Sequence, residues 1–566
     1  MVEGFTERMS WRHPFLFIVL AILFLFIVGR LFYWQVVKAE MLSELAFLQH
    51  SGVIKTTPAR GEIKTQDGFP IVANKISYLV FASPKEIKDK DQALNKLLSV
   101  IDIDKASLSA SFTKEKLWIP VKSGISIDVK EEIEKMNLSG IGFEQYFSRF
   151  YPEASMAASL VGFVGKNDDG KDKGYFGLEG YYDRLLRGKE GYSVEIHDAL
   201  GQPILSKRTV SNGADGSSII LSLDRSVQFL VEEKIKRAIE KYGAEGGSVG
   251  IMEPQTGNVI AMASFPSFDP EHYQEYDGNL YKNYFIANTY EPGSTLKPMI
   301  MAAALDSATV SPQTKCPICQ GPVLVSGYTL HTWNDKYYKD TNMIDVIRHS
   351  DNTGMAFVAL RLGADKIISY LDKFGIGRLT DIDLQGESFA KLKPRSGWYD
   401  VDLATTGFGQ GISVTPIELL SAFSSIANKG VMMQPRVVNA IESPTGQIVK
   451  IPAKIKEKPV SEKTAKIMTE MLVNAVEKGE ASWARIKGYR IAGKTGTASI
   501  PVAGHYDPTN TIASFIGFAP ADDPKFVMLV ILDKPTTSIY AAETAAPLFF
   551  DIAKDLLSYY GIPPSE

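Results

Sequence analysis

The stretch Tyr290-Glu-Pro-Gly-Ser-Thr-Leu-Lys-Pro-Met-Ile-Met-Ala-Ala-Ala-Leu305 places a serine and a lysine three residues apart at the start of an apolar run. Proline is tolerated only near the first turn of a helix, so Pro298 predicts that a buried helix begins close to Ser294. Residues three apart share a helix face, which brings the Lys297 amine toward the Ser294 hydroxyl. Burial lowers the pKa of an amine, as a general base requires, and a helix N-terminus favours negative charge beside the serine.

Ser-x-x-Lys spacing alone is weak evidence, because two further copies of it begin at Ser111 and Ser388. Ser111 lies in a polar stretch with charges on both sides. Ser388 lies among loop-like residues that end in Lys393-Pro-Arg-Ser-Gly397. Neither serine opens a buried helix, so we interpret both copies as surface coincidences.

Two later motifs offer polar groups that suit the same chemistry. Ser350-Asp-Asn352 precedes an apolar helical pattern and offers a hydroxyl and an amide, although taken alone it is better explained as a helix N-cap. Ile491-Ala-Gly-Lys-Thr-Gly-Thr-Ala498 is a predicted strand of small residues, along which a substrate backbone can lie, and Lys494 offers a cation for a carboxylate. The alternative for Lys494 is a lysine that protects an edge strand.

The composition indicates an ordered globular protein with room for two or three domains. The 566 residues are 45% hydrophobic and carry a net charge of -4. Basic residues form no patch or tail, so we expect no nucleic-acid partner.

Residues 15–37 are almost entirely apolar, which is long enough to span a bilayer. Arg30 interrupts the run near one end, and Tyr33 and Trp34 suit a membrane interface. A cleaved signal peptide is the alternative, but no small-residue cleavage site follows. We therefore expect residues 1–14 to be a cytoplasmic tail and residues 15–37 to be an uncleaved anchor.

The two cysteines form the sequence Cys316-Pro-Ile-Cys319. In an oxidising compartment they can form a tight disulfide. As a metal site they are half a set, with His331 a possible third ligand, whereas structural zinc requires four. We expect no metal and no cofactor, and the state of the two thiols stays open.

The segment 211–217 has the composition of a linker, after which helices and strands are interleaved. Strands are predicted at both ends of this region, over residues 247–252, 259–264, 493–498, 512–518 and 526–532. A mostly helical middle includes a helix capped by Thr415 with Glu418 at its third position. This order predicts an α+β domain with one antiparallel sheet.

Ser-x-x-Lys, Ser-x-Asn and Lys-Thr-Gly follow one another about a domain's length apart, which is a specific signal. Residues 219–566 resemble the penicillin-binding transpeptidase domain, which has the serine β-lactamase-like fold with an antiparallel sheet and a helical subdomain. The N-terminal part resembles class B penicillin-binding proteins. It does so through Arg60-Gly61-x-Ile63, Arg149-x-Tyr-Pro152 and Gly177-Leu-Glu179 with Asp183. The resemblance implies an elongated pedestal or dimerisation domain over residues 38–215 and a transpeptidase domain over residues 216–566.

By this resemblance the protein is a D,D-transpeptidase that cross-links peptidoglycan stem peptides and is inhibited covalently by β-lactams. Ser294 would attack the D-Ala-D-Ala carbonyl and form an acyl-enzyme, with Lys297 as general base. Ser350 would relay a proton to the leaving D-alanine, and Asn352 would orient the acyl chain.

The resemblance also gives roles to the Lys-Thr-Gly strand. Lys494 and Thr495 would tune the proton network, and Thr495, Gly496 and Thr497 would bind substrate, with Thr497 at its terminal carboxylate. The backbone N–H groups of Ser294 and Thr497 would form the oxyanion hole.

Three other kinds of protein share this fold. A class A β-lactamase needs a Glu-x-x-Leu-Asn loop, which the sequence lacks. A bifunctional class A penicillin-binding protein would carry a glycosyltransferase domain where the pedestal-like motifs lie. A non-catalytic β-lactam sensor or scaffold usually has several membrane spans, and one is visible here.

The resemblance further implies partners and a location. Class B proteins work with a SEDS-family glycosyltransferase and other membrane proteins of cell-wall synthesis, and we assign Arg30 to that interface as a hypothesis. The protein would be single-pass in the bacterial cytoplasmic membrane with its catalytic domain on the periplasmic or extracytoplasmic side. A septal role is slightly favoured over a lateral one.

Overall fold

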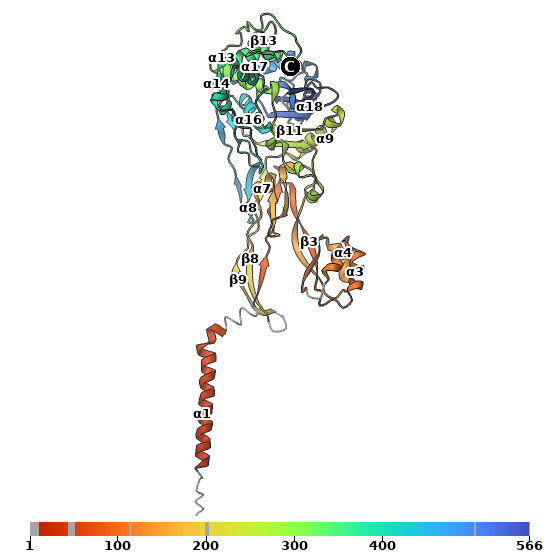
Figure 1. Ribbon diagram of the computed structural model, residues 1–566, viewed down its shortest axis with the longest axis vertical. Helices are drawn as coiled ribbons and strands as arrows, with labels where there is room; N and C mark the ends of the chain where they lie inside the picture. Colours follow the sequence, from red (N-terminus) through yellow and green to blue (C-terminus); the bar gives the residue numbers. More distant parts are fainter. Residues whose placement is uncertain (1–10, 43–50, 113–115, 198–202, 503–504, 565–566) are drawn as a thin grey trace, which may run out of the picture. The chain divides into compact units, whose positions relative to one another are not determined.

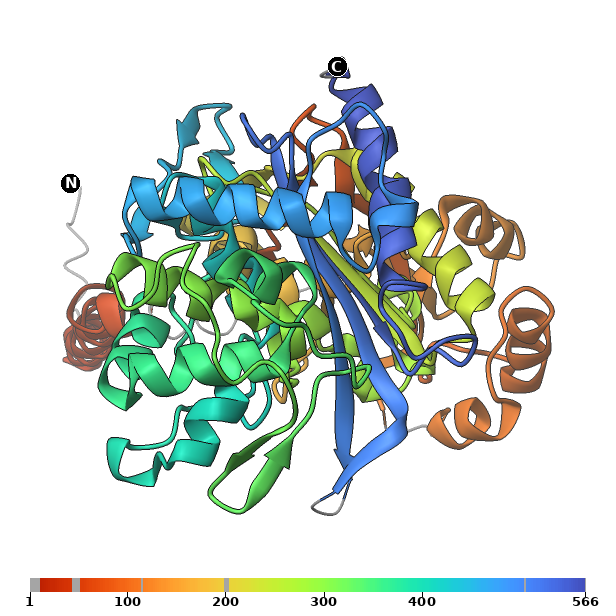
Figure 2. The same ribbon diagram turned by 90° about the horizontal axis from the view of Figure 1, so that it is seen from above.

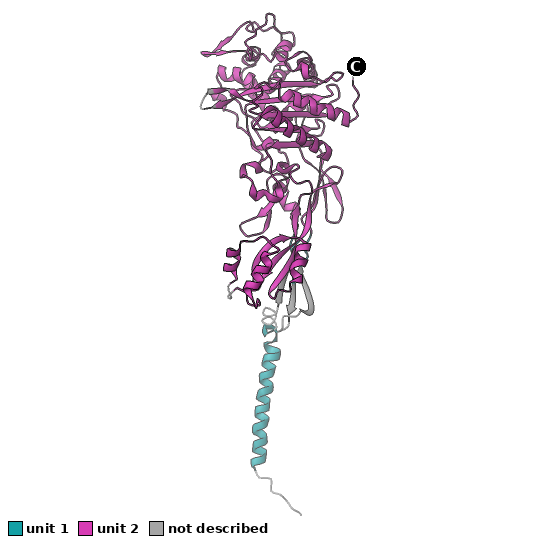
Figure 3. Cartoon of the chain, turned by 90° about the vertical axis from the view of Figure 1, so that its right-hand side faces the viewer, with its two compact units in different colours: residues 1–58, 189–214 teal, residues 59–188, 215–566 magenta. Residues whose placement is uncertain are grey.

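A computed structural model describes residues 11–42, 51–112, 116–197, 203–502 and 505–564. The chain divides into two compact units, residues 1–58 with 189–214 and residues 59–188 with 215–566, which are coloured separately in Figure 3. Most of the predicted tail, residues 1–14, lies outside the described residues. The predicted domain boundary between residues 215 and 216 stays a prediction.

The first unit contains the apolar helix and a three-stranded antiparallel sheet. Helix α1 (Arg12–Phe32), red in Figure 1, continues into a π-helical turn η1 (Tyr33–Val37), and none of its residues is buried. Among the described residues it is the one helix that is long and apolar enough to cross a membrane. The sheet has the order β1-β8-β9, formed by β1 (Ser51–Thr56), β8 (Gly191–His197) and β9 (Pro203–Ser211).

In the second unit, residues 59–188 are built on the long strand β3 (Pro70–Ala82). It pairs with β2 (Ile63–Lys64) through a turn at Asp67-Gly68, and with β4 (Ile119–Ile125) and β5 (Ile141–Phe150). A small apolar core lies between these strands and three helices. The helices are α3 (Lys90–Leu98), α4 (Lys105–Ser111) and α5 (Ile127–Lys135).

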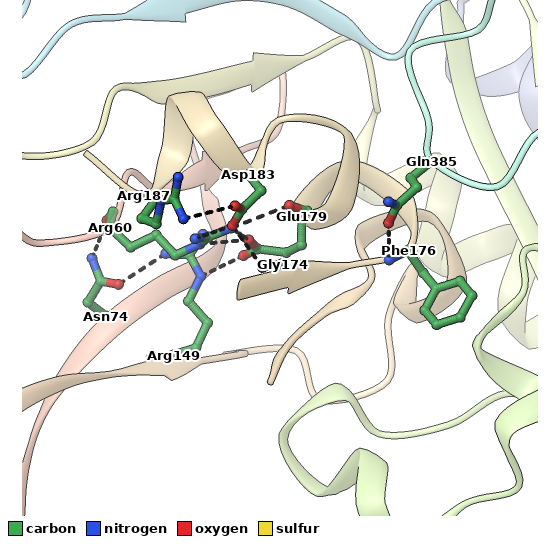
Figure 4. A network of polar contacts seen from close by, with 9 residues as sticks. All are labelled: Arg60, Asn74, Arg149, Gly174, Phe176, Glu179, Asp183, Arg187 and Gln385. Atoms are coloured by element: carbon green, nitrogen blue, oxygen red, sulfur yellow. Dashed lines mark hydrogen bonds and ion pairs between the residues drawn. The ribbon is translucent and has the colours of Figure 1, made fainter. Parts of the chain in front are cut away.

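The three pedestal motifs meet in one buried ionic network, drawn in Figure 4. Glu179 is 0% exposed and accepts hydrogen bonds from Arg60 at 2.5 Å and from Arg149 at 2.7 Å. Arg60 also donates to Asp183 at 2.9 Å, and Asn74 accepts from Arg149 at 3.0 Å. The residues that carry the class B resemblance therefore form one structural centre.

The network is continuous with the rest of the second unit. Asp183 accepts from the backbone N–H of Gly174 at 2.7 Å, and Gln385 accepts from that of Phe176 at 2.7 Å (Figure 4). Strand β2 pairs in parallel with β10 (Ser218–Leu221). One sheet, in the order β17-β16-β10-β2-β3-β4, thus contains strands from both sides of residue 215.

The main sheet is five-stranded and antiparallel, in the order β12-β11-β21-β20-β19. The predicted strands are confirmed, with slightly longer bounds. They are β11 (Gly246–Met252), β12 (Val259–Phe265), β19 (Ala492–Val502), β20 (His505–Ala519) and β21 (Phe526–Asp533). Strand β19, which carries Lys494, lies at the edge.

Helices cover both faces of this sheet, as the view from above in Figure 2 shows. Strand β21 is buried on both sides, with Val527, Leu529 and Ile531 in one core and Met528, Val530 and Leu532 in the other. This alternation follows from the two-residue period of a strand. Helices α9 (Arg225–Tyr242) and α18 (Ala545–Tyr559) pack on the second face.

The first face is covered by the helical part of the domain. Helix α16 (Pro416–Ala427) is buried along its whole length and begins with the predicted capping box of Thr415 and Glu418. Around it lie α11 (Lys297–Asp306), α13 (Asn352–Leu362) and α17 (Glu462–Lys478).

The remaining elements connect these layers. The helices are α6 (Ala158–Val161), α7 (Gly177–Tyr181), α8 (Asp183–Leu186), η2 (Pro270–Glu275), η3 (Gly278–Tyr281), α10 (Tyr284–Ala287), α12 (Met343–Arg348), α14 (Ala364–Lys373), η5 (Arg395–Gly397), α15 (Asp400–Gly407) and η6 (Ser482–Ala484). The strands are β6 (Phe163–Lys166), β7 (Asp172–Tyr175), β13 (Val323–Val325), β14 (Tyr328–Leu330), β15 (Met432–Met433), β16 (Val438–Glu442), β17 (Ile448–Lys450) and β18 (Ile455–Glu457).

Candidate active site

Ser294 lies in a 3₁₀ turn, η4 (Gly293–Leu296), that leads directly into α11. The regular α-helix begins at Lys297, three residues later than predicted. Pro298 stands in its first turn, where its missing N–H costs no hydrogen bond. The preceding turn is closed by the Thr295 hydroxyl, which donates to the Pro292 carbonyl at 2.6 Å. Ser294 stays half-buried at the N-terminal end of a buried helix, as the predicted chemistry requires.

Glycines hold this turn against the sheet edge. Gly293 has φ +56° and donates to the Gly409 carbonyl at 3.0 Å. A Cβ at Gly409 would lie 2.0 Å from the Gly293 carbonyl oxygen. A Cβ at Gly496 on β19 would lie 2.6 Å from Ser514 Oγ and 2.7 Å from Thr295 Cγ2. Gly496, predicted as a substrate-binding residue, therefore also lets the turn that contains Ser294 approach the strand.

Lys297 is 0% exposed, and its hydrogen bonds lead to the Ser-x-Asn motif. Its Nζ donates to the Ser350 carbonyl at 2.6 Å, to Asn352 Oδ1 at 2.8 Å and to Ser350 Oγ at 3.2 Å. The sequence predicts a direct approach to Ser294, whereas in the structure the connection runs through the Ser350 hydroxyl. Burial, together with the positive charge of Lys494, holds the pKa of Lys297 well below its usual value.

Ser350 connects the two motifs. Its Oγ donates to Ser294 Oγ at 3.0 Å, and its side chain is 3% exposed. Its φ is +55°, a left-handed backbone conformation that is unfavourable for a residue with a Cβ. The N-cap of α13 is Asp351, which accepts from the backbone N–H of Gly354 at 3.0 Å. The capping alternative for Ser350 is therefore wrong, and its hydroxyl is free for the site.

Asn352 lies at the first position of α13 and is half-buried. While its Oδ1 accepts from Lys297, its Nδ2 donates to the His331 carbonyl at 3.0 Å. Both ends of the amide are thus fixed by the protein.

Strand β19 places the side chains of Lys494 and Thr497 in different environments. Lys494 is 3% exposed, and burial lowers its pKa, which excludes the interpretation as a solvated lysine that protects the edge. Its Nζ donates to Thr495 Oγ1 at 2.9 Å. Thr497 is exposed, and its Oγ1 accepts from the Ala541 N–H at 3.0 Å, which leaves its own O–H to donate.

The Ser388 copy of Ser-x-x-Lys lacks these surroundings. Ser388 lies outside any helix, with Lys391 exposed. Ser111 is the last residue of α4, and Lys114 lies outside the described residues. The interpretation of Ser388 as a surface coincidence agrees with the structure.

Cys316 and Cys319 form a disulfide with each other and are both buried. Their sulfurs are therefore not available as metal ligands. The described residues contain no group of three or more His, Cys, Asp or Glu that could hold a metal ion.

Two regions of the chain match known protein families. Residues 247–556 match the family model for the penicillin-binding protein transpeptidase domain, and residues 55–221 match that for the penicillin-binding protein dimerisation domain. The chain belongs to the penicillin-binding protein transpeptidase family. Because both domains are present, it is a class B penicillin-binding protein, and a peptidoglycan D,D-transpeptidase.

Similar proteins cover nearly the whole chain. Stage V sporulation protein D of Bacillus subtilis is 35% identical over 99% of this chain and 88% of its own length. Peptidoglycan D,D-transpeptidase FtsI of Escherichia coli is 28% identical over 99% of this chain and 94% of its own. The crystal structure of penicillin-binding protein 3 from Mycobacterium tuberculosis, complexed with aztreonam, has a TM-score of 0.71 at 26% identity and covers 91% of this chain and 98% of that one.

Proposed function

We propose that this transpeptidase cross-links stem peptides through an acyl-enzyme on Ser294, with release of D-alanine. The observation that supports it is the chain of contacts from Ser294 Oγ to Ser350 Oγ and on to the buried amine of Lys297. It joins a nucleophile to a base through one hydroxyl, while Lys494 supplies a cation on the facing strand.

In acylation, Ser294 Oγ attacks the carbonyl of the penultimate D-alanine. Burial holds the pKa of Lys297 below its usual value, which favours the neutral amine, whose lone pair can accept a proton. The Ser294 proton moves to Ser350 Oγ as the Ser350 proton moves to Lys297. When the tetrahedral intermediate collapses, the same path returns the proton to the amine of the leaving D-alanine. The ester on Ser294 is then attacked by an amine of a second stem peptide, which forms the cross-link and frees the serine.

The binding groups follow from the strand geometry. The terminal carboxylate of the donor peptide would lie at the Thr497 hydroxyl, and the positive charge of Lys494 on the same strand would attract it. The backbone N–H groups of Ser294 and Thr497 would bind the oxyanion, the first at the N-terminal end of α11 and the second on the edge strand. A β-lactam would enter the same groups and leave a slowly hydrolysed ester on Ser294.

Labelling with a fluorescent penicillin, followed by peptide mapping, tests this assignment. We expect a single adduct, on the peptide that contains Ser294. The same preparation should release D-alanine from a D-Ala-D-Ala-type stem peptide and turn over the corresponding thioester. An enzyme that is acylated but fails to turn over the thioester would instead support the β-lactam sensor or scaffold.

We further propose that α1 anchors the protein in the bacterial cytoplasmic membrane, with the catalytic domain on the extracytoplasmic side, and that its partner there is a SEDS-family glycosyltransferase. A septal role is favoured slightly over a lateral one. In α1, Arg30 lies over the ring of Trp34 at 5.8 Å, and a cation in an apolar helix is commonly an interface residue.

Arg30→Ala should therefore weaken co-purification with the glycosyltransferase in detergent, because the helix loses its one charged contact within the apolar run. Labelling of Ser294 should stay at the wild-type level, which controls for correct folding. Gln35→Ala, a polar-to-apolar change at the end of the same span, serves as the matched variant. Unchanged co-purification of Arg30→Ala would contradict the assignment.

A further inference from the structure

Glu480, two residues beyond the end of α17, lies beside the Lys-Thr-Gly strand. Thr495 Oγ1 donates to Glu480 Oε2 at 3.0 Å and accepts from Lys494 Nζ at 2.9 Å. One hydroxyl thus joins the carboxylate to the ammonium, donating to the first and accepting from the second. Glu480 lies fourteen residues before Lys494 and belongs to no motif, so no local pattern in the sequence points to it.

Glu480 is not placed to bind the substrate directly. It lines a cavity of about 10 Å³ together with Arg348, Lys494 and Thr495, and this cavity is too small for a peptide. Its Oε1 is buried without a hydrogen-bond partner. Glu480 as a whole is half-buried, and a buried polar atom without a partner calls for an explanation.

Several charged groups surround this carboxylate. The negative charge of Glu480 raises the pKa of Lys494, to which Thr495 connects it. The same charge raises the pKa of Lys297 on α11. Arg348, at the end of α12, forms an ion pair with Asp345 at 2.8 Å. Near Lys297, the carboxylate of Asp351 raises the pKa of that lysine in the same direction as Glu480 does.

His349, between Arg348 and Ser350, is the remaining titratable group here. Burial and the charge of Arg348 lower its pKa, so it is neutral at physiological pH. Of these groups, Glu480 is the carboxylate that is hydrogen-bonded to the Lys-Thr-Gly strand.

We propose that Glu480 is a positioning residue for transpeptidation, which keeps Lys494 protonated and in place through the Thr495 hydroxyl. This inference rests on the function proposed above. Burial lowers the pKa of Lys494, and the charge of Glu480 opposes that effect. The retained cation attracts the substrate carboxylate. It also lowers the pKa of Lys297, an effect that the direct charge of Glu480 on Lys297 opposes. The role of Glu480 is therefore at Lys494, to which the Thr495 hydroxyl connects it.

The sign of the pH effect follows from this arrangement. Without the negative charge, Lys494 loses its proton at lower pH, and the substrate carboxylate loses its cation. The alkaline limb of the acylation profile should therefore move to lower pH in Glu480→Gln, which keeps the size and the hydrogen bond of the side chain. At the alkaline end of the wild-type plateau, we expect acylation to fall about tenfold, the effect of moving this limb by about one pH unit.

The test measures the second-order rate of acylation by a fluorescent penicillin from pH 6 to pH 10, with the full-length chain in detergent. Wild type, Glu480→Gln and Glu480→Ala are compared, and thermal unfolding confirms that each variant is folded. Formate should restore part of the alkaline activity to Glu480→Ala, since it replaces the missing carboxylate. Glu477→Gln removes a charge from the last turn of α17 and should keep the wild-type profile.

The possible outcomes separate the two proposals. A profile of Glu480→Gln that matches wild type, or a loss that is equal at every pH, would overturn the role of Glu480. Failure of formate to act on Glu480→Ala would count against it as well. If wild type itself is not acylated on Ser294, the failure belongs to the proposed function.

Discussion

Ser294→Ala should abolish covalent labelling by penicillin and reduce transpeptidation by at least about 10⁴-fold, as expected for the loss of a catalytic serine. The alanine removes the only atom that can form the ester, while Ser350, Lys297 and the Lys-Thr-Gly strand remain in place. Because Ser294 is half-buried in a turn held by glycines, the smaller side chain leaves the fold intact. Gel fluorescence measures the label, and release of D-alanine measures turnover.

The sequence itself provides matched controls for this variant. Ser111→Ala and Ser388→Ala remove the serine of the other two Ser-x-x-Lys copies and should be labelled at the wild-type rate. A label that persists in Ser294→Ala, or disappears in either control, would overturn the assignment of the nucleophile. Thermal unfolding of the three variants separates a loss of chemistry from a loss of folding.

Glu179→Ala should lower the free energy of unfolding by about 3–5 kcal/mol, the range for breaking a buried ion pair by removal of one partner. Glu179 is 0% exposed and lies between the guanidinium groups of Arg60 and Arg149. The alanine would leave Arg149 without its carboxylate and Arg60 with Asp183 alone, and a cavity in place of the side chain. Urea denaturation of variant and wild type measures the difference.

An exposed ion pair supplies the control for Glu179. Glu271 lies 2.5 Å from Lys75, but both side chains are partly exposed. Glu271→Ala should therefore cost no more than about 1 kcal/mol. Equal stability losses in the two variants would contradict the structural role of the buried network.

The network also has a pH dependence with a definite sign. Burial alone raises the pKa of Glu179, but Arg149 and Arg60 lower it below its ordinary value. A lowered folded-state pKa contributes stability that is present above the unfolded value, about 4.3, and is lost as the pH falls through the folded value. The wild type should thus lose this contribution in acid, whereas Glu179→Ala has none to lose.

Much of the fold could be predicted from local patterns in the sequence. The capping box at Thr415, the hairpin around residues 254–257 and the strands on either side of residue 520 all lie where expected. Caps, turns and alternation depend on residues a few positions apart, so the sequence displays them directly. The order of the Ser-x-x-Lys, Ser-x-Asn and Lys-Thr-Gly motifs is visible in the sequence for the same reason.

Other features depended on contacts between distant residues. The three-residue spacing predicted that the Lys297 amine approaches the Ser294 hydroxyl. Packing of α13 against α11 placed the Ser350 hydroxyl between these two groups. Burial of Lys494, which excludes the solvated-edge interpretation, results from the layers that cover its strand.

The sequence by itself therefore determined which residue types could carry the chemistry, the elements that hold them and the presence of a long apolar helix near the N-terminus. Only the tertiary structure decided which of these groups touch and how each is charged. Arg60 and Glu179 are 119 residues apart, and Thr495 and Glu480 come from different elements. Distances between such groups, and the burial that changes their pKa values, arise when the layers pack, and no local pattern encodes them.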